Sequence, residues 1–284
     1  MKSFKAIRLG LFFFTFTLAS FSTVAIGQTF KFVVLGDMPY SLPQDLRRFE
    51  NLITEINRLK PSFSIFIGDT KSGSTLCSDE HNQIIKSYFL SFKAPLVYSP
   101  GDNEWTDCHR PLAGAYDPLE RLEALRKVFF STNQSLGKNT IRLQRQADLD
   151  PRYSKYVENA YWIKNNFLFV DIHIPGSNNN NEGAESAIKE YQDRNQANLA
   201  WIDQAFNLAT QRNLNGIIFA YQADMFYKDM KPSKGFEKVV NKLSELTQQY
   251  GKQVFLVNGD SHRFITDKPI LINNQKATLM NFTR

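Results

Sequence analysis

The chain has 284 residues and a formal net charge of +6. Three of its basic residues, Lys2, Lys5 and Arg8, lie in residues 1–27, which hold no acidic residue, so the rest of the chain carries +3. A charge this small gives no reason to expect a specific nucleic-acid partner. The remaining length is enough for one sizeable core, and we expect residues 28–284 to form a single domain and a monomer.

Residues 1–27 have the pattern of a secretory signal peptide. A basic start is followed by an apolar run over residues 9–18 and by the small residues of Ala25-Ile26-Gly27. The alternative is a retained signal anchor, but the run is short for a membrane span, which needs about 20 residues. No later segment is apolar enough to suggest a membrane partner. We therefore expect cleavage near Gly27 and a secreted or periplasmic protein.

Apolar periodicity predicts alternating strands and helices in the part of the chain that follows. Strands are expected at 30–36, 63–67 and 96–98, and the first helix carries Leu46, Phe49, Ile53 and Ile56 on one face. This order predicts parallel pairing of the strands. A further helix is expected at 118–130, whereas residues 133–156 show no clear period.

The second half of the chain begins with a predicted hairpin. Tyr161–Ile163 and Phe167–Ile174 flank the turn residues Lys164-Asn165-Asn166. The hairpin indicates a second, more antiparallel sheet. Beyond it we expect a loop at 175–181, helices at about 184–210 and 236–246, and strands at 216–220, 254–257, 270–272 and 277–280.

Four apolar runs end in the same pair, Gly-Asp, which occurs nowhere else in the chain; the aspartates are Asp37, Asp69, Asp102 and Asp260. Ligands bind at the carboxyl ends of strands in α/β sheets, so we expect the four carboxylates to converge. Two unit charges about 4 Å apart repel by about 4 kcal/mol at an effective dielectric constant near 20. A divalent cation would remove that repulsion. The alternative is that each aspartate caps the helix or turn after it.

These motifs, in this order, resemble those of the calcineurin-like metallophosphoesterase family. That family carries Asp-x-His, Gly-Asp, Gly-Asn-His-Asp/Glu, a lone His and Gly-His-x-His. The corresponding segments here are Gly36-Asp37-Met38-Pro39, Gly68-Asp69-Thr70, Gly101-Asp102-Asn103-Glu104, Tyr221-Gln222-Ala223-Asp224 and Gly259-Asp260-Ser261-His262. The resemblance covers about residues 30–265. It implies a four-layer α/β/β/α sandwich, with two packed mixed sheets flanked by helices, and a metal-dependent phosphoesterase that hydrolyses a small phosphomonoester or phosphodiester.

The chain departs from the family pattern at five positions. Pro39 replaces a histidine ligand and offers no ligand atom, and Asn103 replaces the histidine that usually serves as the general acid. The other three changes keep an oxygen donor where the family has a ligand: Asp102, Gln222 and Asp260. The pattern favours a rebuilt metal site over a decayed one.

Carried over residue by residue, the resemblance implies two metal positions that share Asp69. One would be formed by Asp37, Asp69 and His262, and the other by Asp69, Asp102, Gln222 and Asp260. Oxygen donors favour Mg²⁺, Mn²⁺ or Ca²⁺ over Zn²⁺. We expect one or two ions, with the oxygen-rich position occupied and the other weakly held or empty.

The candidate catalytic and phosphate-binding residues lie in or near the third and the last motif. Asn103 can hydrogen-bond to a phosphate but cannot protonate a leaving group. His109 is a candidate acid, and Arg110 and Arg263 are candidate phosphate-binding residues. The alternative for His109 and Arg263 is a solvated position in a loop.

The chain has two cysteines, Cys77 and Cys108. In an oxidising compartment such a pair predicts one disulfide, which would join the loops after Asp69 and Asp102. The alternative is two free buried thiols. For the whole chain, two other functions stay open: a pseudo-enzyme that holds a cation or an anion on the same scaffold, and a secreted protein with no metal.

Overall fold

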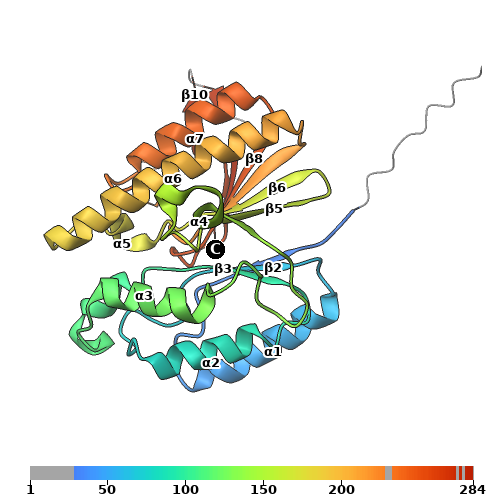
Figure 1. The fold of residues 1–284 in the computed structure, drawn as a ribbon. Helices are drawn as coiled ribbons and strands as arrows, with labels where there is room; N and C mark the ends of the chain where they lie inside the picture. The colour runs from blue at the N-terminus through green and yellow to red at the C-terminus, as the bar shows by residue number, and fades with distance from the viewer. Residues whose placement is uncertain (1–28, 228–231, 273–274, 277–278, 284) are drawn as a thin grey trace, which may run out of the picture.

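The computed structural model describes residues 29–227, 232–272, 275–276 and 279–283 (Figure 1). The predicted signal peptide, residues 1–27, lies outside these residues. Two sheets pack face to face, and helices cover the outer side of each (Figure 1). Within the described residues, no helix combines the length and the apolar character needed to cross a membrane.

The first sheet is parallel throughout and has the strand order β1-β2-β3. Its strands are β1 (Val33–Leu35), β2 (Ser64–Ile67) and β3 (Leu96–Ser99). β1 is shorter than the predicted strand at 30–36, because its pairing with β2 begins where Val33 lies opposite Ser64. The outer face is covered by α1 (Gln44–Leu59), α2 (Asp79–Phe89) and α3 (Pro118–Phe129), and two 3₁₀ helices follow β3: η1 (Thr106–His109) and η2 (Pro111–Ala113).

The second sheet is mixed and has the order β4-β5-β6-β7-β8-β12-β9. Its strands are β4 (Gln144–Arg145), β5 (Ala160–Lys164), β6 (Phe167–Asp171), β7 (Gly216–Ala220), β8 (Gln253–Asn258), β9 (Ile265–Asp267) and β12 (Leu279–Thr283). The predicted hairpin is confirmed as the antiparallel pair β5 and β6. Its turn residues Asn165 and Asn166 have φ of 48° and 63°, a left-handed conformation that asparagine tolerates.

Two long helices, α6 (Glu185–Gln211) and α7 (Glu237–Tyr250), cover the outer face of the second sheet, as predicted. The remaining elements are short: α4 (Gln146–Leu149), η3 (Pro151–Tyr153), α5 (Gly176–Asn179) and the hairpin of β10 (Leu271–Ile272) and β11 (Gln275–Lys276). The predicted strand at 277–280 begins with two residues outside the described part, and its last two residues open β12.

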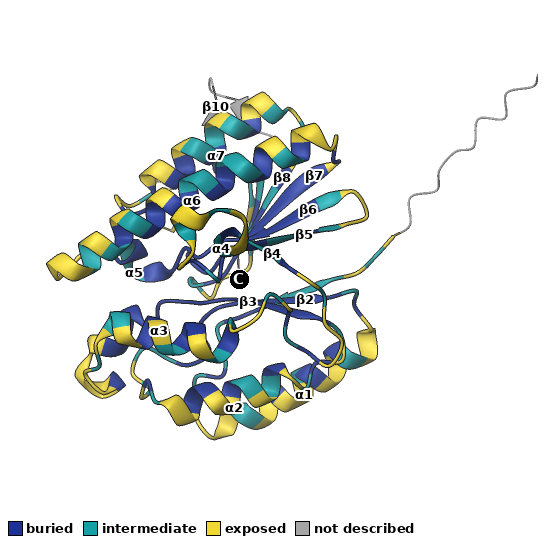
Figure 2. Ribbon diagram, in the orientation of Figure 1, coloured by how far each residue is buried: buried dark blue, intermediate teal, exposed yellow. Residues whose placement is uncertain are grey.

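Alternation along the strands builds three apolar layers. In β7, Ile217 packs toward α6 and α7, whereas Ile218 packs between the two sheets. In β2, Ile65 faces the space between the sheets and Phe66 faces the helices of the first sheet. The buried sides of the helices accordingly face the sheets (Figure 2). These apolar layers separate four layers of secondary structure in the order α/β/β/α, which confirms the expected fold class.

Candidate metal centre

The four Gly-Asp pairs follow strands β1, β2, β3 and β8, and the fold brings them to one end of the two sheets. Asp69, Asp102 and Asp260 each offer a carboxylate oxygen, and the three oxygens lie within 4.8 Å of one another. The fourth aspartate, Asp37, accepts a hydrogen bond from the backbone N–H of Asp260 at 3.1 Å. The expected convergence of the four strand ends is therefore present.

The backbone at three of these strand ends is left-handed. Asp37, Asp69 and Asp260 have φ of 54°, 58° and 73°. Aspartate is among the few residues other than glycine that adopt this conformation at modest cost. Such strain clusters at functional sites, where the surrounding structure holds it in place.

Two glycines of these pairs, Gly101 and Gly259, each make room for the aspartate of another strand. A Cβ atom on Gly101 would lie 2.1 Å from Oδ1 of Asp69, and one on Gly259 would lie 2.6 Å from Oδ2 of Asp37. No side chain fits at such distances. At two of the four pairs the glycine thus has a physical basis: it lets a carboxylate from a neighbouring strand approach the backbone.

Burial and mutual repulsion dominate the electrostatics of the cluster. Only 3 % of Asp69 is exposed. Burial, followed by the charges of Asp102 and Glu104, raises the pKa of Asp69 well above its ordinary value. Burial and the charge of Asp102 likewise raise the pKa of Asp260 to about 7. Without a cation, the cluster therefore retains protons that solvent-exposed carboxylates would lose.

Asp102 is held by two side chains from the second half of the molecule. Its Oδ2 accepts a hydrogen bond from Ser177 at 2.7 Å, and its Oδ1 accepts one from Nε2 of Gln222 at 3.1 Å. The other amide atom of Gln222, Oε1, accepts the backbone N–H of Gly176. Gln222 thus turns its nitrogen toward the cluster, and its amide would have to rotate before its oxygen could bind a metal.

Asn103 lies beside the cluster and binds Asp69 twice. Its Nδ2 donates to Oδ2 of Asp69 at 2.8 Å, and its backbone N–H donates to Oδ1 at 3.4 Å. Asn103 therefore orients the aspartate that was expected to bridge the two metal positions.

Sequence reasoning missed Tyr40, which occupies the other side of Asp69. Its hydroxyl donates to Oδ2 of Asp69 at 3.0 Å and lies 3.0 Å from Nε2 of His262. The same histidine nitrogen lies 3.6 Å from Oδ1 of Asp37. Burial, with the charges of Asp69 and Asp37, raises the pKa of Tyr40 above its ordinary value, so its hydroxyl stays protonated. The available signal was its position next to Pro39, where the family pattern loses a histidine.

A second missed feature is Lys71, which is 1 % exposed. Its ammonium donates to the carbonyl oxygen of Ser72 at 3.2 Å. Burial lowers its pKa, and the negative charges of Glu104 and Asp107 oppose that shift. Lys71 therefore supplies a built-in positive charge on the side of the cluster that Glu104 occupies.

Glu104 lies on the same side of the carboxylate cluster as Lys71. Its Oε1 accepts hydrogen bonds from the backbone N–H of Thr70 at 2.9 Å and from Tyr98 at 3.0 Å. Its Oε2 is buried without a hydrogen-bond partner among the described residues. A Cβ atom on Gly101 would lie 2.9 Å from that oxygen. Such an orphaned carboxylate oxygen fits a site that gains a cation.

The candidate phosphate-binding residues lie at different places around the site. Arg110 pairs with Asp107 at 2.7 Å, and Asp107 shares the hydroxyl of Ser177 with Asp102. Arg263 is exposed in the loop directly after His262. Arg110 is thus connected to the cluster through hydrogen-bonded side chains, whereas Arg263 faces solvent next to it.

His109 is also exposed, at the end of η1. Its Nδ1 lies 2.7 Å from the carbonyl oxygen of Thr106. A carbonyl only accepts, so Nδ1 carries a proton and donates this hydrogen bond.

The predicted disulfide is confirmed: Cys77 and Cys108 are bonded, with Cα atoms 5.8 Å apart. Both residues are buried. The bond ties the loop after β2 to the loop after β3, and these loops carry Lys71, Asn103 and Arg110. It therefore fixes one wall of the candidate metal centre.

No protein-family model and no curated protein matches the sequence. Among solved structures, a dimetal phosphatase from Danio rerio is similar over 89 % of this chain and 86 % of its own, with 11 % identity and a TM-score of 0.56. A purple acid phosphatase from yellow lupin seeds (Lupinus luteus) is similar over 90 % of this chain and 44 % of its own, with 14 % identity and a TM-score of 0.48. Identities this low establish the fold and nothing finer. The chain has the calcineurin-like α/β fold.

Proposed function

We propose that the chain is a metal-dependent phosphoesterase that hydrolyses a phosphomonoester or a phosphodiester. One observation carries this proposal: carboxylates from separate strand ends converge within 4.8 Å at one end of the two sheets. The fold is shared with a dimetal phosphatase, which supports the same class of chemistry at a coarse level.

The donor set fits a hard divalent cation. Asp69, Asp102 and Asp260 would form the oxygen-rich position, and Asp37 and His262 would join Asp69 in the other. These donors favour Mg²⁺, Mn²⁺ or Ca²⁺ over Zn²⁺. When bound, the cation would neutralise the carboxylates and supply Lewis-acid charge to a phosphoryl oxygen.

The chain's own residues would bind and orient the ester. Asn103 holds Asp69, and Arg110 is positioned to bind phosphate oxygens once it leaves or shares Asp107. In the hydrolysis, the oxygen of water bonds to phosphorus, the bond from phosphorus to the ester oxygen breaks, and the departing alcohol takes one proton. His109 is our proposed donor of that proton, through Nε2.

Export and a monomeric state remain part of the proposal. The disulfide of Cys77 and Cys108 is compatible with an oxidising compartment. Together with the sequence pattern of residues 1–27, it supports a secreted or periplasmic protein.

The direct test is an assay of the purified protein on an aryl phosphomonoester and an aryl phosphodiester, with Mg²⁺, Mn²⁺, Ca²⁺ and Zn²⁺ in turn. Asp69→Asn should abolish hydrolysis, because it removes the carboxylate that contacts both proposed positions. Asp193→Asn, at an exposed position on α6, is the matched control and should leave the rate unchanged. Hydrolysis that survives Asp69→Asn would contradict the metal mechanism.

A second function, a pseudo-enzyme that only binds a metal or an anion, is favoured by two observations. Pro39 offers no ligand, and the oxygen of Gln222 already accepts a backbone hydrogen bond. Such a protein would be stabilised by divalent cations yet hydrolyse none of the esters in the assay above.

A further inference from the structure

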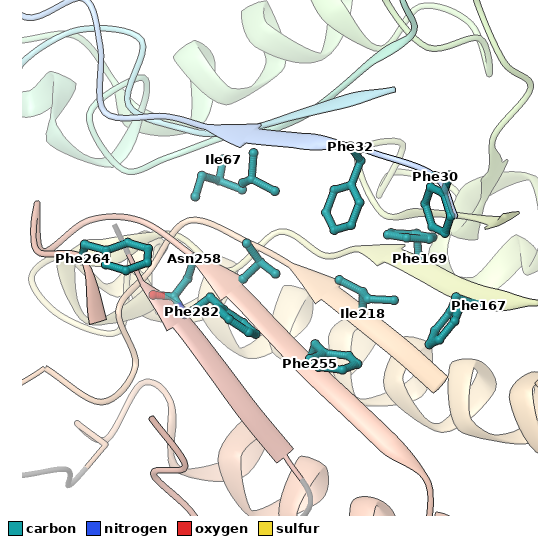
Figure 3. Close-up of a pocket in the computed structure, with 12 residues that line it drawn as sticks. Phe30, Phe32, Ile67, Phe167, Phe169, Ile218, Phe255, Asn258, Phe264 and Phe282 are labelled. Atoms are coloured by element: carbon teal, nitrogen blue, oxygen red, sulfur yellow. The ribbon is translucent and has the colours of Figure 1, made fainter. Parts of the chain in front are cut away.

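A cavity of about 500 Å³ lies between the two sheets, beside β1 (Figure 3). Small-molecule sites in proteins commonly have volumes of about 300–1,000 Å³ and mostly apolar walls. This cavity is lined mainly by aromatic and aliphatic side chains, among them Phe30, Phe32, Phe169, Ile218, Phe255 and Phe282. Its size and walls are those of a ligand site.

The cavity exists because the two sheets differ in width. β1 is the edge strand of the first sheet, whereas the second sheet continues past β8 through β12 and β9. The inward side chains Phe255 and Val257 of β8 are consequently only partly buried. On the opposite wall, Phe30 and Phe32 are also half-buried.

The chemistry of the walls restricts the ligand to an apolar group. Among the described residues that line the cavity, only Asn258 has a polar side chain. Its Nδ2 already donates to Oδ1 of Asn281 at 2.6 Å. A sugar, a nucleobase or a charged group would lose its hydrogen bonds to water here without replacement. A hydrocarbon chain loses none.

The cavity is elongated along the strands. Phe264 and Asn258 lie at one end, and Phe30 and Phe167 lie at the other (Figure 3). From Phe255 to Asn258 alone the wall spans about 10 Å, at about 3.3 Å per residue. This shape suits an extended aliphatic chain better than a compact ring system.

Three strands that form the walls run directly into the candidate metal centre. Val34, Ile67 and Val257 line the cavity, and the same strands continue to Asp37, Asp69 and Asp260. The strand-end side of the cavity also holds Phe264, which is 85 % exposed and follows His262 and Arg263. The cavity and the carboxylate cluster are therefore adjacent.

We propose that this cavity binds the hydrocarbon tail of the substrate, which is then a phosphate ester of an aliphatic alcohol. The inference rests on the proposed function, because it places the phosphate at the carboxylate cluster. The tail enters past Phe264 and lies between the sheets. Arg263, at the same entrance, is placed to bind the anionic end.

The test compares the hydrolysis of decyl phosphate and ethyl phosphate at concentrations where both are monomeric. Each methylene transferred from water into the cavity should raise kcat/KM by about fourfold until the cavity is full. Val257→Trp, which fills the cavity from a half-buried position, should lower kcat/KM for decyl phosphate by at least about tenfold and leave that for ethyl phosphate within about twofold. Leu90→Trp, at an exposed position after α2, is the matched control and should change neither rate.

Binding of decyl phosphate to Asp69→Asn, followed by calorimetry, separates this inference from the proposed function. Binding that Val257→Trp abolishes supports the cavity. Hydrolysis of both esters with no preference for the longer chain, and no effect of Val257→Trp, overturns the inference and leaves the proposed function standing. Chain binding without hydrolysis of any ester overturns the proposed function, and with it the assignment of the chain to a substrate. A dimer in sedimentation that Val257→Trp dissociates would show that a second copy fills the cavity, and would also overturn the inference.

Discussion

Two buried acidic groups in the described part of the chain, one at Glu158 and one at Asp69, have opposite environments. In the first, Glu158 is buried and receives two hydrogen bonds from Arg126, at 2.7 and 3.1 Å, and one from His173 at 2.9 Å. In the second, Asp69 is surrounded by other carboxylates and receives hydrogen bonds only from neutral groups among the residues described. The charge of Glu158 is balanced by an arginine of the chain. No cationic side chain bonds to Asp69 among the residues described, and Lys71 lies on the Glu104 side of the cluster.

The pKa values reflect this difference. Burial alone would raise the pKa of Glu158, but the charge of Arg126 holds it below its ordinary value. Burial also raises the pKa of Asp69, and there the neighbouring carboxylates raise it further. A buried charge that is paired stabilises its surroundings, whereas a buried cluster of like charges indicates a binding site.

The largest expected effect comes from breaking the paired group. Arg126→Met would leave Glu158 as a buried anion beside a neutral histidine, and should lower the free energy of unfolding by about 3–5 kcal/mol. Arg152→Met is the control, since it removes an exposed arginine paired with Asp150, and should cost at most about 1 kcal/mol. Urea unfolding measures both. Equal losses would show that Glu158 is not held by Arg126.

The next effect comes from completing the unpaired group. Mn²⁺ at about 100 times its dissociation constant should stabilise the protein by about 2.7 kcal/mol. The melting temperature should rise with Mn²⁺ and fall again with a chelator, and Asp69→Asn should remove the response. A melting temperature that changes with neither Mn²⁺ nor chelator would favour the metal-free alternative, in which the aspartates only cap turns.

The pH dependence of stability should also separate the two groups. The pKa of Asp260 is about 7, against 3.8 ordinarily, so the unfolded chain loses this proton first. Deprotonation of Asp260 should therefore remove stability from the metal-free protein as pH rises from about 4 to about 7. Glu158 has a lowered pKa, so its contribution is fully present about one unit above the ordinary value of 4.5 and is constant at higher pH.

Urea midpoints at pH 5 and pH 8, measured in chelator, test this sign. Asp260→Asn should remove the part of this decline that Asp260 causes and leave the part that Asp69 causes. Excess Mn²⁺ should raise stability more at pH 8 than at pH 5, because the metal binds deprotonated carboxylates. The buried His81, whose pKa is lowered to about 4, adds stability as pH rises in both proteins, so the comparison is between the two profiles. Identical profiles for the wild type and Asp260→Asn would contradict the account of the cluster.

The smallest effect concerns the orientation of Asp69. Tyr40→Phe removes the hydroxyl that contacts Asp69 and His262, and should weaken Mn²⁺ binding by about tenfold with little change in stability. Tyr88→Phe is the control, because the hydroxyl of Tyr88 bonds to the exposed Glu50. Calorimetric titration with Mn²⁺ measures the affinity of both variants. Equal affinities of Tyr40→Phe and Tyr88→Phe for Mn²⁺ would show that Tyr40 has no part in metal binding.

Much of the fold could be predicted because local patterns set it. The spacing of Phe49, Ile53 and Ile56 gave helix α1, and the four Gly-Asp pairs indicated strand ends that converge. Residues 133–156 could not be assigned, because β4, α4 and η3 are too short to show a period. The cavity could not be predicted from the sequence either. It depends on the pairing of β12 between β8 and β9, and no local sequence pattern indicates that pairing.

The details of the site also depend on tertiary contacts. The hydrogen bond that turns the amide of Gln222 comes from Gly176, which is distant in sequence. Tyr40 and His262 are in contact although 222 residues separate them in the sequence. Residue types and spacing predict which side chains gather at the strand ends, but not which atoms they present.

The most direct test of the central claim is anomalous scattering from crystals of the protein grown with Mn²⁺ and, separately, with Zn²⁺. We predict one strong Mn²⁺ peak among Asp69, Asp102 and Asp260, with the position beside Asp37 and His262 weak or empty. No peak among these carboxylates, or two fully occupied Zn²⁺ ions, would contradict it.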